Sequence, residues 1–304
     1  SGAAISDDWR RQMGEIVGAG VIAHEPTIML PKEQRLALND GKENSLVPGF
    51  ARLRKEVLDA LKPDTVIVLD THWFTTVEFI VTSHPHRKGK YTSEELPRGM
   101  SQVPYDLPGD PALAQHIAEC ASEDGVRTTA LDDPCLPIHY PTVNLAHYLQ
   151  VPGENWITIG VCQTAVDWQF LSVGASVARA VADMDRRVVI YGTGGLSHTF
   201  WPLPELPEHE ACDPVHIRTP EARAADEQRI AWMEAGKHAR VIDTMEDFHQ
   251  YNPEGFFGHY LMMAGALGGK QCRAPGRRFS DYQNATGTGQ VHVWFDRPDA
   301  GWAA

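Results

Sequence analysis

Three histidines in this chain each follow a short run of residues with the composition of a buried β-strand. The pairs are residues 15–22 with His24, residues 66–69 with His72, and residues 187–191 with His198. Short runs of β-branched and apolar residues are typical of strands covered on both faces of a sheet. In an open α/β sheet, ligands bind in the crevice outside the carboxyl ends of the strands. If the three strands are parallel neighbours, their imidazoles converge at one edge.

His24 and His72 are the candidate metal ligands. Two neutral imidazoles with one carboxylate form the facial triad of non-haem Fe(II) oxygenases. The same three donors also suit catalytic zinc, which activates a bound water. The competing interpretation is that each histidine is only a polar residue satisfied at a strand end. One histidine alone fits that interpretation, whereas the matched positions favour a site.

Three acidic residues are candidates for the third ligand. Glu25 adjoins His24, and a neighbouring side chain rarely turns onto the same ion. Asp70 lies two residues before His72 and could instead orient an imidazole. Glu254 begins an apolar segment, where an unpaired charge is costly, although a carboxylate is favourable at the start of any helix. Composition favours Glu254 and leaves the other two open.

The elements that must position these residues indicate one α/β domain. We predict a mixed, mostly parallel central sheet between helical layers over residues 13–304, with residues 1–12 as a tail. An amphipathic helix over 49–61 leads into the strand before His72, and this order favours a right-handed parallel crossover. Further helices are predicted at 111–123, 143–149, 167–183, 220–244 and 256–267, and further strands at 77–82, 126–131 and 156–161.

Several proline- and glycine-rich stretches are predicted to lack regular structure. They are residues 26–48, 84–110, 133–141 and 201–220. Long ordered loops in a compact domain are usually functional. We therefore expect 201–216, which follows His198, to form a mobile lid at the mouth of the site. A final strand pair is predicted at 279–282 and 290–295.

Composition excludes some functions. The net charge of -13 disfavours nonspecific attraction to nucleic acid or an anionic membrane. No apolar run approaches the roughly 20 residues that a membrane span needs. The five cysteines include no CxxC, so neither a zinc ribbon nor a disulfide framework is indicated. We expect a cytoplasmic protein.

Six segments of the chain resemble the class III extradiol ring-cleavage dioxygenases, the superfamily of the protocatechuate 4,5-dioxygenase β subunit. Within it, they are most similar to the homoprotocatechuate (3,4-dihydroxyphenylacetate) 2,3-dioxygenases. The segments are residues 23–26, 68–73, 91–97, 194–198, 253–255 and 286–290. They follow the family order from the first strand to the last, which makes the resemblance specific although each segment alone is weak.

The resemblance implies an Fe(II) ion held by His24, His72 and Glu254, with His198 as the acid–base residue. It also implies a small aromatic substrate, O₂ as co-substrate, and a homo-oligomer, either a dimer or a tetramer. His139 stands where many members of the superfamily have a histidine beside the substrate, whereas the homoprotocatechuate enzymes have an acidic residue. We therefore predict that His139 lies in the pocket but does not bind the metal; the alternative is a surface histidine.

The predicted reaction is extradiol cleavage of a catechol to a hydroxymuconic semialdehyde type of product. Three alternatives stay open. The substrate could be a 2-aminophenol, the chain could be a zinc-dependent hydrolase with the same His, His, Glu site, or it could be a non-catalytic partner subunit.

Overall fold

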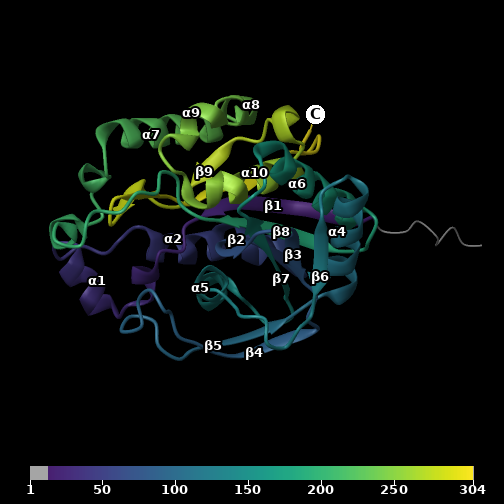
Figure 1. Cartoon of the computed structure of the whole chain (residues 1–304), viewed down its shortest axis with the longest axis horizontal. Helices are drawn as coiled ribbons and strands as arrows, with labels where there is room; N and C mark the ends of the chain where they lie inside the picture. Colours follow the sequence, from purple (N-terminus) through teal and green to yellow (C-terminus); the bar gives the residue numbers. More distant parts are fainter. Residues whose placement is uncertain (1–12, 304) are drawn as a thin grey trace, which may run out of the picture.

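A computed structural model of the chain describes residues 13–303 and shows one α/β domain (Figure 1). The predicted tail, residues 1–12, lies outside the described residues, so the boundary at residue 13 stays a prediction. Within residues 13–303, no helix has both the length and the apolar character needed to cross a bilayer.

The core of the fold is an eight-stranded sheet with the order β6-β3-β7-β2-β8-β1-β12-β9. Its strands are β1 (Glu15–Ile22), β2 (Thr65–Thr75), β3 (Phe79–Thr82), β6 (Thr128–Leu131), β7 (Asn155–Cys162), β8 (Arg187–Thr193), β9 (Gly276–Arg278) and β12 (Val293–Asp296). The strands β7, β2, β8 and β1 run parallel, while β12 pairs antiparallel with β1 and β9. This confirms the predicted mixed, mostly parallel sheet.

The position of β2, β8 and β1 as direct neighbours decides where the site forms. All three are parallel, so their carboxyl ends lie side by side. His24 and His198 lie in the segments that follow β1 and β8, and His72 lies in the last part of β2.

Helices cover both faces of the sheet, as predicted (Figure 1). One face packs against α4 (Pro111–Glu123), α6 (Asp167–Ala182) and α10 (Gly258–Ala266), and the other against α2 (Leu46–Leu53) and α5 (Tyr140–Leu149). The predicted start of α4 is confirmed: Pro111 occupies its first turn, and the Asp110 side chain accepts a hydrogen bond from the Leu113 amide at 3.1 Å. Such N-caps satisfy an amide that lacks a partner in the helix.

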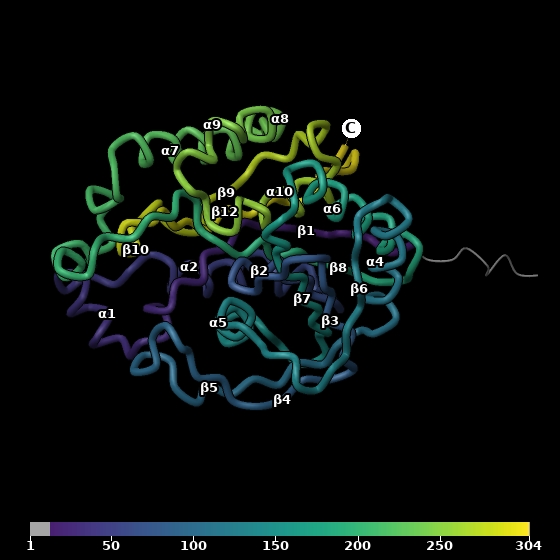
Figure 2. The backbone as a smooth tube through the Cα atoms, viewed as in Figure 1, coloured from purple at the N-terminus to yellow at the C-terminus, as the bar shows by residue number. Residues whose placement is uncertain are grey.

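Residues 84–110, predicted as a loop, instead contain a two-stranded antiparallel sheet. Its strands are β4 (His86–Tyr91) and β5 (Val103–Pro108). In Figure 2 they run on the far side of α5 from the central sheet. The prolines of β5 are tolerated because each of the two strands has a free edge. Because β4 has charged residues and no apolar run, its sequence does not indicate a strand.

The predicted final strand pair, 279–282 with 290–295, is wrong in its bounds and in its pairing. The chain forms β9 and β12 at the edge of the main sheet, and a separate hairpin of β10 (Gln283–Ala285) and β11 (Thr288–Gln290) between them. Strands of three or four residues are defined by their pairing partners more than by their own composition.

Several helical boundaries also differ from prediction. The helix at 49–61 begins earlier, as α2, and continues through a π-helical turn (Arg54–Leu58) into α3 (Asp59–Leu61). The predicted 220–244 helix is divided at Gly236, whose φ of +67° ends the first segment. The remaining segments are α1 (Lys32–Leu38), α7 (Pro220–Glu234), α8 (His238–Asp243), α9 (Met245–His249) and the 3₁₀ turns Pro26–Met29, Leu206–His209, Pro214–His216, Glu254–Phe257 and Gly269–Gln271.

Candidate metal centre

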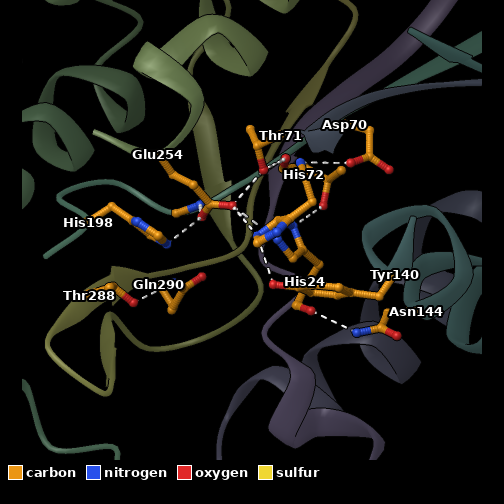
Figure 3. Close-up of polar contacts among 12 residues, drawn as sticks. His24, Asp70, Thr71, His72, Tyr140, Asn144, His198, Glu254, Thr288 and Gln290 are labelled. Atoms are coloured by element: carbon orange, nitrogen blue, oxygen red, sulfur yellow. Dashed lines mark hydrogen bonds and ion pairs between the residues drawn. The ribbon is translucent and has the colours of Figure 1, made fainter. Parts of the chain in front are cut away.

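The predicted ligand atoms meet at one point (Figure 3). Glu254 Oε1 lies 3.1 Å from His24 Nε2 and 3.2 Å from His72 Nε2. These are the three side chains that the sequence favoured, and they come from the segment after β1, from β2 and from the turn before α10. His24 and Glu254 are buried, and His72 is 16% exposed.

The sequence predicted that His72 lies beyond the end of its strand. In the structure it lies within β2, in an irregular part of the strand. The pairing of β2 with β8 stops at Asp70, and its register with β7 shifts between Asp70 and Phe74. Such a bulge re-aims a side chain. Asp70 holds the bulge by accepting the His72 backbone amide at 2.9 Å and the Thr142 hydroxyl at 2.8 Å. Asp70 therefore contacts the backbone of His72, not its imidazole.

Thr193 fixes the tautomer of His24. The Thr193 hydroxyl donates to the Ile22 carbonyl at 2.9 Å, so it accepts from His24 Nδ1 at 2.8 Å. With its hydrogen on Nδ1, His24 presents the lone pair of Nε2 towards Glu254. A hydrogen bond from the distal nitrogen is the usual way in which a protein orients a metal-binding imidazole.

His72 is oriented by two further side chains. Its Nδ1 lies 3.1 Å from Glu95 Oε1, and its Nε2 lies 2.7 Å from the Tyr140 hydroxyl. Burial alone would lower the pKa of His72, but its hydrogen bonds with Glu254 and Glu95 outweigh burial and raise the pKa to about 10. The surroundings of this imidazole therefore favour a positive charge.

Two donors outside the histidines hold the Glu254 carboxylate. The Thr71 hydroxyl donates to Oε1 at 2.5 Å, and the Gly195 amide donates to Oε2 at 2.5 Å. Burial would raise the pKa of Glu254, but the imidazoles of His24 and His198 hold it well below its usual range. Glu254 is thus an ionised acceptor.

Two glycines allow this close approach. A Cβ on Gly255, whose φ is +55°, would lie 2.8 Å from the Thr71 methyl group. A Cβ on Gly195 would lie 3.0 Å from Glu254 Oε2 and 2.7 Å from the Gly289 carbonyl oxygen. Side chains at either position would force apart the carboxylate and its donors.

These residues fit a divalent metal ion. Two imidazole nitrogens and a carboxylate oxygen lie within 4.8 Å of one another, His24 Nε2 presents a lone pair, and the donors are those that Fe(II) and zinc sites use.

His198 lies beside this group. Its Nε2 is 3.9 Å from Glu254 Oε2, the oxygen that faces away from the other two imidazoles. Burial lowers the pKa of His198, against the attraction of Glu254. The neutral form of such an imidazole can take up a proton.

His139 lies near the site but outside the three ligands. Its ring stacks on Trp73 with centroids 6.3 Å apart. It is half-buried, and its Nε2 is buried without a hydrogen-bond partner among the described residues. Burial lowers the pKa of His139, while Asp70 opposes this shift. The surroundings of Nε2 thus differ from those of a histidine that faces solvent.

Sequence reasoning missed several residues that build the site. They are Thr71, Glu95, Tyr140, Asn144 and Thr193, of which Asn144 donates to the His24 carbonyl at 2.8 Å. Each lies within a few residues of a segment that the sequence had singled out. Their hydrogen-bond partners are distant in the chain, so no local sequence pattern indicates these contacts.

The segment 201–216 begins close to the site, since Phe200 contacts the His198 ring at 4.8 Å between centroids. It contains two 3₁₀ turns. The Asn284 side chain, in β10, donates to the carbonyls of His209 and Ala211 at 2.9 and 2.8 Å. These bonds attach the segment to the β10–β11 hairpin. Its role as a moving lid stays a prediction.

A mostly parallel sheet that brings two imidazoles and a carboxylate together at one edge, as a candidate metal site, is typical of an α/β enzyme. A family model described as the catalytic LigB subunit of aromatic ring-opening dioxygenase matches residues 18–296. The chain belongs to this family and is an aromatic ring-opening dioxygenase. The resemblance read from six sequence segments is thereby confirmed.

Characterised relatives agree with this assignment. The chain is 27% identical over 260 residues to the 3,4-dihydroxyphenylacetate 2,3-dioxygenase of Escherichia coli, covering 84% of this chain and 91% of that protein. It is 24% identical to the 2-aminophenol 1,6-dioxygenase alpha subunit of a Pseudomonas species, covering 70% and 78% of the two chains. The beta subunit of the same name is 22% identical, with coverage of 95% and 97%.

A solved structure supports the fold. An uncharacterised protein of Escherichia coli K12 superposes with a TM-score of 0.62 at 16% identity, covering 92% of this chain and 99% of that one.

Proposed function

We propose that this chain is an Fe(II)-dependent extradiol dioxygenase that opens a catechol ring next to its hydroxyl-bearing carbons. The product would be of the hydroxymuconic semialdehyde type. The observation that carries the proposal is that Nε2 of His24 and Nε2 of His72 lie 3.1 and 3.2 Å from the same oxygen of Glu254, while Nε2 of His198 lies 3.9 Å from its other oxygen.

The three ligands suit this chemistry by charge as well as by geometry. One carboxylate leaves a ferrous site with net positive charge, which favours an anionic catecholate. When bound, Fe(II) supplies the point at which the electron-rich ring and O₂ are brought together and exchange electrons. His24, His72 and Glu254 would hold it, in the orientations that Thr193, Glu95 and Thr71 impose.

Proton transfer falls to His198. We propose that its Nε2 takes a proton from the substrate hydroxyl and later gives a proton to an oxygen atom derived from O₂. This is the usual role of a general acid–base residue. The Tyr140 hydroxyl, 2.7 Å from His72 Nε2, can donate a hydrogen bond to substrate oxygen.

A 2-aminophenol is the second candidate substrate. Relatives named for this activity cover most of the chain, and an amino group next to a hydroxyl can chelate iron as a catechol does. We also propose a homo-oligomer, a dimer or tetramer, in the cytoplasm; the location rests on the five cysteines, all free.

The test is to load the purified chain with Fe(II) anaerobically and to record O₂ uptake with a panel of catechols and 2-aminophenols. Uptake with a catechol and a yellow ring-opened product are expected. Zinc in the purified protein, with no O₂ uptake after iron loading, would favour the hydrolase alternative. Turnover that appears only after a second subunit is added would revive the partner-subunit alternative.

His139 is expected to contact the substrate. An imidazole can donate a hydrogen bond to a catecholate oxygen, whereas an ionised carboxylate only accepts. His139→Ala should lower kcat/KM by about 10-fold, the equivalent of one hydrogen bond of about 1.4 kcal/mol, with iron content unchanged. His147→Ala, an exposed position on α5, is the matched control. Unchanged kcat/KM in His139→Ala, or loss of iron, would contradict this role.

A further inference from the structure

The loop that carries His198 is held amide by amide. Five successive N–H groups each donate to a different part of the fold. The bonds are Gly194 to the Ile22 carbonyl (3.2 Å), Gly195 to Glu254 Oε2 (2.5 Å), Leu196 to the Gly289 carbonyl (2.8 Å), Ser197 to Asp226 Oδ1 (2.9 Å) and His198 to the Tyr251 carbonyl (3.3 Å). The path of this loop is therefore set by contacts distant in sequence.

Asp226, in α7, is the one partner in this series that is a side chain outside the metal centre. It is fully buried and accepts three hydrogen bonds. Besides the Ser197 amide, its Oδ2 accepts the Ser197 hydroxyl and the Tyr282 hydroxyl, each at 2.7 Å. Burial raises the pKa of Asp226 to about 7, against the effect of these bonds. A buried carboxylate is costly unless it is hydrogen-bonded. Two of the three hydrogen bonds to Asp226 come from Ser197, in the loop that carries His198.

The two bonds to Ser197 constrain both its backbone and its side chain. Because Ser197 directly precedes His198, fixing its orientation also fixes the direction in which the next residue leaves the loop. The Gly289 amide completes the constraint by donating to the Ser197 carbonyl at 3.0 Å. The His198 imidazole is then held beside Glu254.

We propose that Asp226 is a positioning residue, which acts through Ser197 to place the His198 imidazole for proton transfer. The inference rests on the function proposed above for His198. A displacement of about 1 Å in a reacting group can lower a rate by as much as 10²-fold, so a residue that never touches substrate can affect turnover strongly.

A carboxylate suits this position better than an amide of the same shape. Asp226 can accept from all three donors at once, whereas asparagine has only one accepting oxygen. Asp226→Asn therefore keeps the volume of the side chain but leaves either the Ser197 amide or the two hydroxyl protons without their acceptor, because its NH₂ group must replace Oδ1 or Oδ2.

The test is a double-mutant cycle between Asp226→Asn and His198→Gln in the iron-loaded enzyme. Asp226→Asn alone should lower kcat by about 10-fold, with KM and iron content unchanged. In the His198→Gln background the same change should have no further effect on kcat, because the residue through which it acts is already lost. Equal losses in both backgrounds would show a general structural effect and overturn the proposal.

Hydrogen exchange supplies a readout that does not depend on activity. Asp226→Asn should speed exchange of the amides of residues 194–198 while the exposed control on the same helix, Glu227→Gln, leaves it unchanged. Unchanged exchange in Asp226→Asn would also overturn the proposal. Should the wild-type enzyme show no O₂ uptake with any aromatic substrate, the proposed function fails, and the exchange result still decides whether Asp226 holds the loop.

Ser197→Ala is a second variant in case Asp226→Asn does not fold. It removes only the 2.7 Å hydroxyl bond and keeps the amide bond. A smaller fall in kcat, absent in the His198→Gln background, is expected; an equal fall in both backgrounds counts against the proposal.

Discussion

Replacing His72 by alanine is expected to abolish both metal binding and turnover. His72 Nε2 is one of three donors around the proposed iron, and the Ala variant leaves only His24 and Glu254. Loss of a residue that merely orients a metal ligand typically costs 10–100-fold in affinity, so loss of a ligand itself should cost more than about 100-fold. Elemental analysis after gel filtration and O₂ uptake measure the two effects.

His86→Ala is the matched control for this experiment. His86 is half-exposed on β4, and among residues 13–303 its ring pairs with Asp106 alone, so its removal should change neither iron content nor turnover. Full iron occupancy in His72→Ala would count decisively against the ligand assignment, and with it against the proposed iron site.

His198→Gln is expected to keep iron and bind catechol, yet to lose turnover by roughly 10²–10⁴-fold. Its Nε2 lies 3.9 Å from Glu254 Oε2, on the side of the carboxylate opposite the other imidazoles, so metal binding does not need it. Glutamine can donate and accept hydrogen bonds in place of the imidazole, but its amide does not take up or release a proton at neutral pH.

Three measurements on His198→Gln separate binding from proton transfer. They are elemental analysis for iron, anaerobic spectrophotometric titration for catechol binding, and O₂ uptake for kcat. The opposite outcome for iron in His72→Ala makes the two variants controls for each other. Near-normal turnover, or an iron-free protein, would show that His198 has another role.

The sequence alone indicated the strands that deliver the three histidines. The runs in β1, β2 and β8 are apolar because both faces of these strands are buried, and such burial leaves a mark on local composition. β1 and β8 end within two residues of their apolar runs, whereas β2 continues through its bulge to Thr75. The helix α4 was predicted with its observed bounds, since its N-cap and its apolar spacing are both local signals.

The hairpin of β4 and β5 and the strands β9–β12 were predicted wrongly or missed. β9 lies at the edge of the main sheet, β12 lies next to it, and the other four strands form two separate hairpins. Such short or peripheral strands need no long apolar run. Pairing with a partner defines them, and the partner cannot be read from the strand itself.

The sequence thus determined the class of the fold, the family and the candidate site residues. Buried strands, helix caps and short motifs can be recognised from residues that are close together in the sequence. Only the tertiary structure decided which carboxylate joins the imidazoles. Glu25, adjacent to His24, turns to Thr27 at 2.9 Å, whereas Glu254 meets Thr71 across 183 positions of the chain. The contacts of Tyr140 and Thr193 with the two imidazoles likewise join residues that are distant in the sequence. A hydrogen bond depends on distance and direction in space, and the order of parallel strands, not separation in sequence, sets both.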